Sequence, residues 1–474
     1  MILNYINGEF IKAQSGKTEK LINPATEEVI DEITWGDISD CKAAIDAADT
    51  AFKTWSKTNV YQRSAILKKA ADIIRANVNE YAKDTVMESG KPMVEAKGEW
   101  MVAANLFEWF AEEAKRAYGR TIPAIRNDKR MMTIWQPIGI VGVITAWNFP
   151  AYNPARAWAA ALAAGCTLVT KGSEFTASST NSLVKALSEA GLPAGVLNNL
   201  NGDAAIIGDE FLSNPVVKKI SFTGSTRVGK ILMDGASKTN TKLSLELGGN
   251  APVIINYDVS VEALAVSSVT AKLRNAGQVC VAPQRFFVHA SVYDEFVSIA
   301  SDAIKNIKVG YGWERDTNVG PLINQRQQQQ VLGIIEHAKH AGAHAAAANV
   351  PSDKGWFVPP TILTNVDETT EAVNKEIFGP VMPIIKWEHK NDVIEWANNT
   401  PYGLASYVWT NNINDAFLFS ESLEFGMVGI NEWAPHATEA PFGGWKQSGI
   451  GHESGSEGLY EYMEKKLISW GGLS

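Results

Sequence analysis

The stretch "IGIVGVITAWNFPAYNPARAWAAALAAGCTLVTK", residues 138–171, contains a strand pattern, a helical pattern and a second strand pattern. "IGIVGVITAW" is a short apolar run of the kind found in buried strands. "NPARAWAAALAAG" is helical in character, and "TLVTK" returns to a strand pattern. A strand, a helix and a further strand of these lengths predict the repeating unit of a parallel α/β sheet.

The same alternation continues on the carboxyl side of this stretch. The further strand patterns are "VLNNL", "VKKISFTG" and "KLSLELGG", and helical patterns precede each of them. A second alternating stretch covers roughly residues 250–430, whereas residues 41–120 are mainly helical and residues 1–40 are strand and turn in character. Residues 121–137 interrupt the helical pattern with mixed charge. We therefore expect an α/β protein with two parallel-sheet domains.

Composition narrows the class of protein. A chain of 474 residues with 45% hydrophobic and 20% charged residues predicts two or three globular domains. The net charge of -9 opposes attraction to nucleic acid or anionic membranes, so neither is expected as a partner. No apolar run approaches the roughly 18 residues of a membrane span, and the start lacks the pattern of a secretory signal. Three scattered cysteines fit a reducing compartment, which predicts a cytoplasmic protein.

Two motifs could bind a ligand, the first an anion and the second a metal ion. "GSTRVGKI", residues 224–231, places a glycine-bounded turn between a strand and a helix, where N–H groups face an anion; the alternative is a plain tight turn. It is not a P-loop, because Ile231 stands where a hydroxyl must bind magnesium. His337, His340 and His344 recur at helical spacing, but their polar, alanine-rich surroundings indicate a solvated helix face, and no metal is expected.

Cys280, in "RNAGQVCVA", differs from the other two cysteines. Cys41 and Cys166 lie in helical or apolar surroundings typical of buried filler, whereas Cys280 is surrounded by small and polar residues. A nucleophilic thiolate needs access and a nearby base. Glu246 in "LELGGNAP" and Asn148 in "AWNFP" both follow predicted strands, where α/β enzymes bind ligands. The spacing alone leaves both interpretations of Cys280 open.

Taken together, the sequence resembles the aldehyde dehydrogenase superfamily over essentially its whole length. The motifs that carry the resemblance, in the family's order, are "AWNFP", "KGSE", "SFTGSTRVG", "LELGGNAP", "NAGQVC", "EIFGPV" and "APFGGWKQSGIGHE". The resemblance implies NAD(P)-dependent oxidation of an aldehyde to an acid. Cys280 would be the nucleophile, Asn148 an oxyanion donor and Glu246 the base that activates water for hydrolysis of a thioester. CoA-acylating relatives commonly lack this glutamate, so hydrolysis is favoured.

The resemblance also implies the cofactor site. Lys171 and Glu174 would contact the adenosine ribose, and a carboxylate there favours NAD, with NADP possible as an alternative. The other residues implied for the cofactor are Trp147, Gly224, Ser225, Gly229, Glu376 and Phe378.

The family implies three structural parts. Residues 1–120 and 138–246 would form the NAD(P)-binding domain, and residues 247–440 the catalytic domain. Residues 121–137 and 455–474 would form a small oligomerisation arm of a homodimer or homotetramer. A terminal strand that exposes an unpaired edge independently suggests pairing with another subunit.

Two arginines bear on the substrate. Arg156 and Arg274 stand where relatives acting on apolar aldehydes usually carry aromatic residues, and this resembles succinate-semialdehyde dehydrogenases, whose matching arginines grip a distal carboxylate. Phe149, Tyr152 and Phe442 would line the same pocket. The expected substrate is a semialdehyde such as succinate semialdehyde; the alternatives are a hydroxyaldehyde, such as lactaldehyde or glycolaldehyde, or an aromatic semialdehyde. One or both arginines could instead form ion pairs inside the protein.

Overall fold

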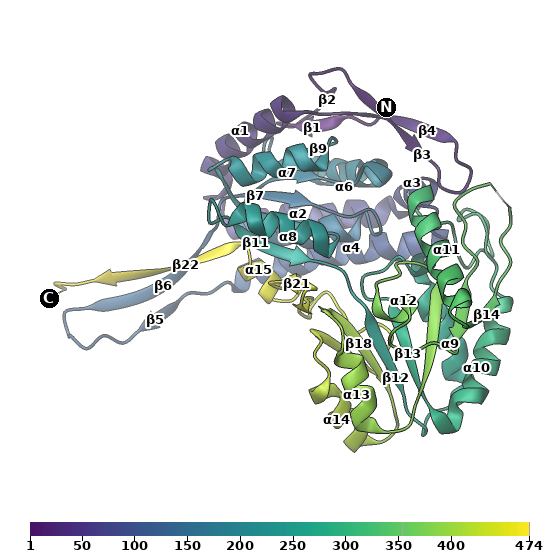
Figure 1. The fold of residues 1–474 in the computed structure, drawn as a ribbon. Helices are drawn as coiled ribbons and strands as arrows, with labels where there is room; N and C mark the ends of the chain where they lie inside the picture. The colour runs from purple at the N-terminus through teal and green to yellow at the C-terminus, as the bar shows by residue number, and fades with distance from the viewer. Residues whose placement is uncertain (353, 474) are drawn as a thin grey trace.

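The computed structural model describes residues 1–352 and 354–473, and it contains two large sheets and a projecting three-stranded arm (Figure 1). In the first sheet the strand order is β2-β1-β9-β8-β7-β10-β11-β21. The strands from β9 to β11 are parallel, and β1 and β21 add antiparallel to its two ends. The bounds are β1 (Asn4–Ile6), β2 (Glu9–Ile11), β7 (Ile140–Ile144), β8 (Thr167–Lys171), β9 (Leu197–Leu200), β10 (Val217–Thr223), β11 (Lys242–Glu246) and β21 (Gly449–Ile450).

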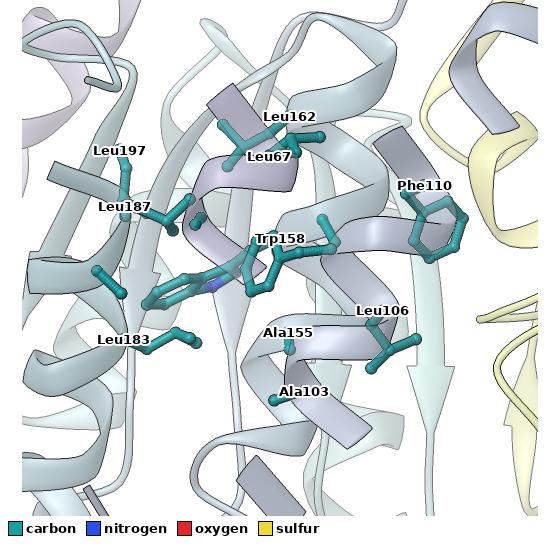
Figure 2. Close-up of a cluster of buried hydrophobic side chains, with 14 of the residues drawn as sticks. Leu67, Ala103, Leu106, Phe110, Ala155, Trp158, Leu162, Leu183, Leu187 and Leu197 are labelled. Atoms are coloured by element: carbon teal, nitrogen blue, oxygen red, sulfur yellow. The ribbon is translucent and has the colours of Figure 1, made fainter. Parts of the chain in front are cut away.

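Helices cover both faces of this sheet, as its two-sided apolar strands require. One face carries α2 (Val60–Ala76), α3 (Val78–Ser89), α4 (Met93–Glu113), α5 (Tyr152–Ala164) and α6 (Ala177–Ala190). The other carries α1 (Ile38–Trp55), α7 (Ala204–Ser213) and α8 (Thr226–Ala236). Figure 2 shows Trp158 of α5 lying among leucines of α2, α6 and β9. The strand, helix and strand predicted within residues 138–171 are confirmed as β7, α5 and β8.

The order of the strands locates a crevice. From β7 the chain proceeds through α5 to β8 on one side, and later returns as β10 on the other side of β7. The loops that leave β7 and β10 therefore diverge at the carboxyl edge of the sheet. Ligands of open α/β sheets bind at such a reversal of strand order.

The second sheet has the order β14-β15-β16-β13-β12-β18-β19, and all its neighbours are parallel except β14 with β15. Its strands are β12 (Ala251–Ile255), β13 (Pro283–His289), β14 (His344–Ala347), β15 (Thr361–Thr364), β16 (Val381–Trp387), β18 (Ala405–Trp409) and β19 (Met427–Ile430). Its helices are α9 (Val261–Leu273), α10 (Ala290–Lys305), α11 (Gln325–His340), α12 (Glu371–Asn374), α13 (Lys390–Asn398) and α14 (Ile413–Ser422). The helical spacing expected through His344 is wrong: Gly342 adopts φ 98° just after α11, and His344 begins a strand.

A four-residue connection, residues 247–250, joins β11 of the first sheet to β12 of the second. The carboxyl edge of the first sheet therefore meets the amino edge of the second. The loop before β13 lies at the same edge, because β13 pairs with β12 from Ala251 opposite Pro283. This topology brings Glu246, at the end of β11, near the loop that carries Cys280.

The arm consists of β5 (Arg120–Ile122), β6 (Arg130–Pro137) and β22 (Met463–Trp470), which pair antiparallel and extend away from the body (Figure 1). Just before β22, α15 (Glu457–Tyr460) packs against α5. Two smaller antiparallel pairs are β3 (Thr18–Ile22) with β4 (Val29–Thr34) and β17 (Tyr402–Gly403) with β20 (Trp445–Lys446). Within residues 1–352 and 354–473, no helix is both long and apolar enough to cross a membrane.

Candidate active site

A pocket of about 290 Å³ lies between the carboxyl edge of the first sheet and the Cys280 loop. It brings together eight of the predicted residues, namely Trp147, Asn148, Gly224, Ser225, Glu246, Cys280, Glu376 and Phe378. A larger groove of about 1000 Å³ runs along α9 and includes Arg274, but neither Cys280 nor Glu246 lines it. The chemistry-bearing groups therefore identify the smaller pocket as the candidate active site.

Cys280 lies in a loop whose backbone is tightly held. Asn275 and Ala276 adopt φ of 49° and 53°, which is unusual for residues with a β-carbon. Gly249 passes so close that a β-carbon there would lie 2.3 Å from the Cys280 carbonyl oxygen. Gly248 similarly approaches Glu376, where a β-carbon would lie 2.5 Å from Oε2. The two glycines of "LELGGNAP" thus allow the connection between the sheets to reach both the nucleophile loop and Glu376.

The electrostatics around Cys280 oppose ionisation. Burial is the main cause that raises the pKa of its thiol to about 12; Arg156 opposes this rise, and Glu246 and Glu376 contribute to it. At neutral pH the side chain is therefore a neutral thiol in this arrangement. Formation of the thiolate requires either a base that accepts its proton or an added positive charge in the pocket.

Asn148 is held on both sides of its amide. Its Nδ2 donates to the Gln278 carbonyl at 3.1 Å, and its Oδ1 accepts from Asn153 Nδ2 at 3.0 Å. One of the two Nδ2 hydrogens remains for another acceptor. The bond to Gln278 ties the Asn148 amide to the loop that carries Cys280, so the two groups share one local framework.

Glu246 belongs to a buried cluster with Glu453 and Arg156. The Arg156 Nε lies 2.9 Å from Glu453 Oε2, and both side chains are almost inaccessible, at 1% and 3% exposure. Burial raises the pKa of Glu246 well above its usual range, Glu453 raises it further, and Arg156 lowers it. Burial likewise raises the pKa of Glu453. Arg156 is the cation that acts on both carboxyl groups, while Lys219 lowers the pKa of Glu453 alone; the mutual repulsion of the two buried carboxylates favours retention of a proton on at least one of them.

The two arginines differ in their surroundings. Arg156 forms the internal ion pair with Glu453, and its Nη1 has no hydrogen-bond partner among the described residues. Arg274 is exposed and lies 5.2 Å from the centre of the Phe149 ring, and no described residue forms an ion pair with it. The Arg156 guanidinium also lies 4.8 Å and 4.4 Å from the centres of the Tyr152 and Phe442 rings.

His436 faces the same region. Its ring is edge-on to Phe442 at 5.9 Å, and its Nδ1 is buried without a hydrogen-bond partner among the described residues. Burial, with smaller contributions from the positive charges of Arg274 and Arg156, lowers its pKa to about 4. This region therefore holds two guanidinium groups beside a neutral imidazole. Arg274 forms no ion pair with a described residue, although burial raises the pKa of Glu95 and the charge of Arg274 opposes this rise.

The opposite side of the pocket suits a dinucleotide. Ser225 caps α8, and its side chain accepts from Val228 N at 3.4 Å, so the amino end of this helix faces the pocket. Gly229 is buried against Leu247, where a β-carbon would come within 2.6 Å. Trp147 and Phe378 meet edge to face at 5.5 Å. These features fit a bound pyrophosphate and a flat ring, so the residues present fit NAD(P).

Lys171 and Glu174 stand outside the pocket lining but on the same edge of the sheet. Lys171 Nζ donates to Glu174 Oε2 at 2.6 Å, just beyond the end of β8.

Glu376 accepts from Gly249 N at 3.0 Å; burial raises its pKa to about 7, while Gly249 and Lys272 oppose this rise. In the part of the chain that the structure describes, no three metal-ligating side chains are grouped to hold an ion.

Some residues near the site were not predicted. Gln327 and Gln330 of α11 line the pocket, Glu453 pairs with Arg156, and Lys272 is buried near Glu376. Glu453 follows "GIGH" in a quoted family motif, which is the one available signal for it. The glutamines lie in the run "QRQQQQ", which indicates only a polar helix face.

Comparison with known proteins agrees with the fold. The model of the aldehyde dehydrogenase family matches residues 10–468. The chain belongs to this family, and it is an aldehyde-oxidising oxidoreductase that uses NAD(P). Within the described structure, the two parallel sheets are those of an aldehyde dehydrogenase fold.

Individual relatives cover nearly the whole chain. A glutarate-semialdehyde dehydrogenase of Pseudomonas putida is 42% identical, over 98% of this chain and 96% of the relative. An NADP-dependent succinate-semialdehyde dehydrogenase of Escherichia coli is 39% identical, over 98% and 97%. The crystal structure of a betaine aldehyde dehydrogenase of Staphylococcus aureus in complex with NAD+ superposes with a TM-score of 0.96 at 34% identity, over 98% and 94% of the two chains.

Proposed function

We propose that this enzyme oxidises a semialdehyde that carries a distal carboxylate, of the succinate and glutarate semialdehyde class, to the corresponding dicarboxylate. The observation that carries the proposal is Arg274, an exposed arginine on the substrate side that forms no ion pair with a described residue. Guanidinium groups bind carboxylates through forked, charge-assisted hydrogen bonds. The relatives named for succinate and glutarate semialdehyde support the same substrate class.

In the proposed reaction, Cys280 Sγ adds to the aldehyde carbon and its proton passes to a base. The resulting alkoxide accepts hydrogen bonds from Asn148 Nδ2 and the Cys280 backbone N–H. NAD(P)+, when bound, supplies the hydride acceptor. Loss of hydride leaves a thioester on Cys280. Glu246 then takes a proton from a water molecule, and the resulting hydroxide attacks the thioester carbon. The carbon–sulfur bond breaks, which releases the acid and, once the sulfur regains a proton, the Cys280 thiol.

The two arginines give a matched pair of variants. Arg274→Ala is expected to lower kcat/KM for succinate semialdehyde by about tenfold or more, since a charge-assisted hydrogen bond contributes about 1.5–3 kcal/mol. For butanal, which has no carboxylate, we expect a change of no more than about twofold. Steady-state kinetics on both aldehydes, with lactaldehyde and an aromatic semialdehyde as further substrates, measures the ratio.

Arg156→Met is expected to behave differently. It leaves Glu453 buried without its ion-pair partner, a defect that costs about 3–5 kcal/mol in typical buried pairs. Activity toward succinate semialdehyde and butanal should therefore fall together, and the free energy of unfolding should fall as well. If Arg274→Ala also lowered both activities equally, or if the wild type preferred an uncharged aldehyde, the carboxylate assignment would be wrong.

For the cofactor we propose a preference for NAD over NADP. A carboxylate at Glu174 would repel a 2′-phosphate, and the carboxylate also occupies Lys171. Glu174→Ser removes the repulsion and leaves Lys171 free to pair with a phosphate. We expect the ratio of kcat/KM for NADP to that for NAD to rise by about tenfold. An unchanged ratio, with Glu19→Ser on the exposed β3 hairpin as control, would refute the role of Glu174.

We also propose that the protein is a homodimer or homotetramer assembled through the arm. The β22 strand is largely exposed, including Leu467 at 58% and Trp470 at 53%, and an exposed apolar strand is a surface for pairing. Light scattering should give a mass of two or four chains. A mass of one chain at micromolar concentration would contradict the proposal.

A further inference from the structure

A charged face of α4 contacts both loops that carry the reacting groups. Lys91 lies just before the helix, and Glu95 and Glu99 follow at intervals of four residues, which places them along one face. Lys91 and Glu99 are nearly inaccessible, at 2% and 5% exposure. Side chains of this kind are rarely buried unless they are paired. None of the three lines the pocket that holds Cys280.

The first contact is with the loop of Asn148. Lys91 Nζ pairs with Glu99 Oε2 at 2.5 Å and donates to the Asn148 carbonyl oxygen at 2.8 Å. The same ammonium lies 4.3 Å from the centre of the Phe149 ring. Lys91 therefore fixes the backbone of the residue whose side chain is the proposed oxyanion donor.

Glu99 holds the other end of this loop. Its Oε1 accepts from the backbone N–H of Ala151 at 2.7 Å and of Tyr152 at 3.2 Å. These N–H groups lie at the start of α5, which has no side-chain cap from its own N-cap residue. A carboxylate at a helix amino terminus is favourable, so Glu99 caps α5 from a different helix.

The second contact is with the loop of Cys280. Glu95 Oε2 accepts from Asn275 N at 2.8 Å, at the first of the two residues with positive φ. Asn275 Nδ2 in turn donates to the Asn148 carbonyl oxygen at 2.9 Å. The same carbonyl thus receives Lys91 from α4 and Asn275 from the nucleophile loop. Strained backbone of this kind persists only where surrounding contacts hold it.

We propose that Lys91, Glu95 and Glu99 are positioning residues that set the relative placement of Cys280 and Asn148 for aldehyde addition and hydride loss. The inference rests on the proposed roles of Cys280 and Asn148, but not on the class of aldehyde. An oxyanion donor acts only when it meets the alkoxide at hydrogen-bond distance, and a displacement of about 1 Å lowers rates on the order of 10²-fold. Loss of the three side chains should therefore affect the chemical step more than binding.

The experiment measures the pre-steady-state burst of NAD(P)H in the full-length enzyme, with any aldehyde that the wild type oxidises. Lys91→Met and Glu95→Ala are expected to slow the burst by 10-fold to 100-fold, with the KM for the cofactor changed by no more than about twofold. Glu95→Gln keeps an acceptor oxygen for Asn275 N and should retain a burst rate near that of the wild type. The difference between Glu95→Ala and Glu95→Gln separates positioning from loss of charge.

Glu88 provides a matched control for stability. It is a buried glutamate that accepts from Ser178 N and Ser179 N at 2.8 Å each, and it contacts neither loop. Glu88→Ala should lower the melting temperature while leaving the burst rate unchanged. The proposal is overturned if Glu95→Ala keeps the wild-type burst, or if the burst rates of all variants simply follow their melting temperatures. If Lys91→Met does not fold, the Glu95 pair and Glu88→Ala still decide the question.

These outcomes are separable from those that test the proposed function. A wild type that oxidises butanal better than succinate semialdehyde contradicts the substrate class, yet the burst with butanal still tests the positioning residues. Conversely, an unchanged burst in Glu95→Ala leaves the Arg274 result untouched.

Discussion

Replacing Cys280 with alanine should abolish NAD(P)H formation from every aldehyde, a loss at least on the order of 10⁴-fold. An aldehyde has no leaving group, so hydride can depart only after a nucleophile has added and formed an alkoxide. Cys280 is the one cysteine whose side chain lines the described pocket, beside Glu246 and Asn148. The measurement is the rate of NAD(P)H formation with a semialdehyde and with butanal.

Cys41 and Cys166 supply controls for the loss of a thiol. Both are buried, and burial raises their pKa values to about 12 and about 11. Cys41→Ala and Cys166→Ala should retain the wild-type kcat, and iodoacetamide should inactivate these variants as it does the wild type. Activity in Cys280→Ala within an order of magnitude of the wild type would exclude covalent catalysis at this residue.

Glu246→Gln should separate the two halves of the reaction. Without the base, the thioester on Cys280 persists, so steady-state turnover should fall by about 10²–10⁴-fold. A burst of about one NAD(P)H per active site should remain, because hydride leaves before water attacks. Hydroxylamine, a nucleophile that needs no base, should restore turnover by cleaving the thioester. Loss of the burst, with no effect of hydroxylamine, would place Glu246 before hydride transfer instead.

The pH dependence of thioester hydrolysis gives a second test of Glu246 as the base. Burial and Glu453 raise the pKa of Glu246, so its carboxylate, the form that can accept a proton from water, exists only at higher pH than for an ordinary glutamate. Hydrolysis of the thioester should therefore fall as pH decreases through a pKa above the usual value of about 4.3. Arg156→Met removes the cation that lowers this pKa, and should move the acidic limb to higher pH.

The local hydrophobic pattern was sufficient to predict the alternating strands and helices of the parallel sheets. The strand runs around "IGIVGVITAW" and "TLVTK" and the helix between them became β7, α5 and β8 because each is buried on every side and has no other way to satisfy its backbone. Pattern could not show that β1, nearly 200 residues away from β9, would pair with it at Tyr5 and Asn199. Nor did spacing reveal that Gly342 would end α11 before His344.

The candidate site was likewise only partly predictable from the sequence. The family motifs indicated residues that the structure brings into one pocket, but they did not indicate which charged side chains form ion pairs. The pairing of Arg156 with Glu453 joins residues on α5 and near the carboxyl terminus, and only the tertiary fold brings them together. Likewise "GKPMVEAKGE" has charges at intervals of four residues that suit a solvated helix face. Burial of this face against two loops is a property of packing rather than of the local sequence.

The unequal surroundings of the two arginines bear on how the enzyme's substrate range can evolve or be redesigned. Position 274 can accept an apolar or aromatic residue in a single step, since Arg274 forms no ion pair with a described residue. Position 156 cannot, because its guanidinium balances Glu453 beside the proposed base. A change there is expected to need a second change at Glu453. Mutational paths toward uncharged aldehydes should therefore begin at residue 274, and those that begin at residue 156 should pass through an impaired intermediate.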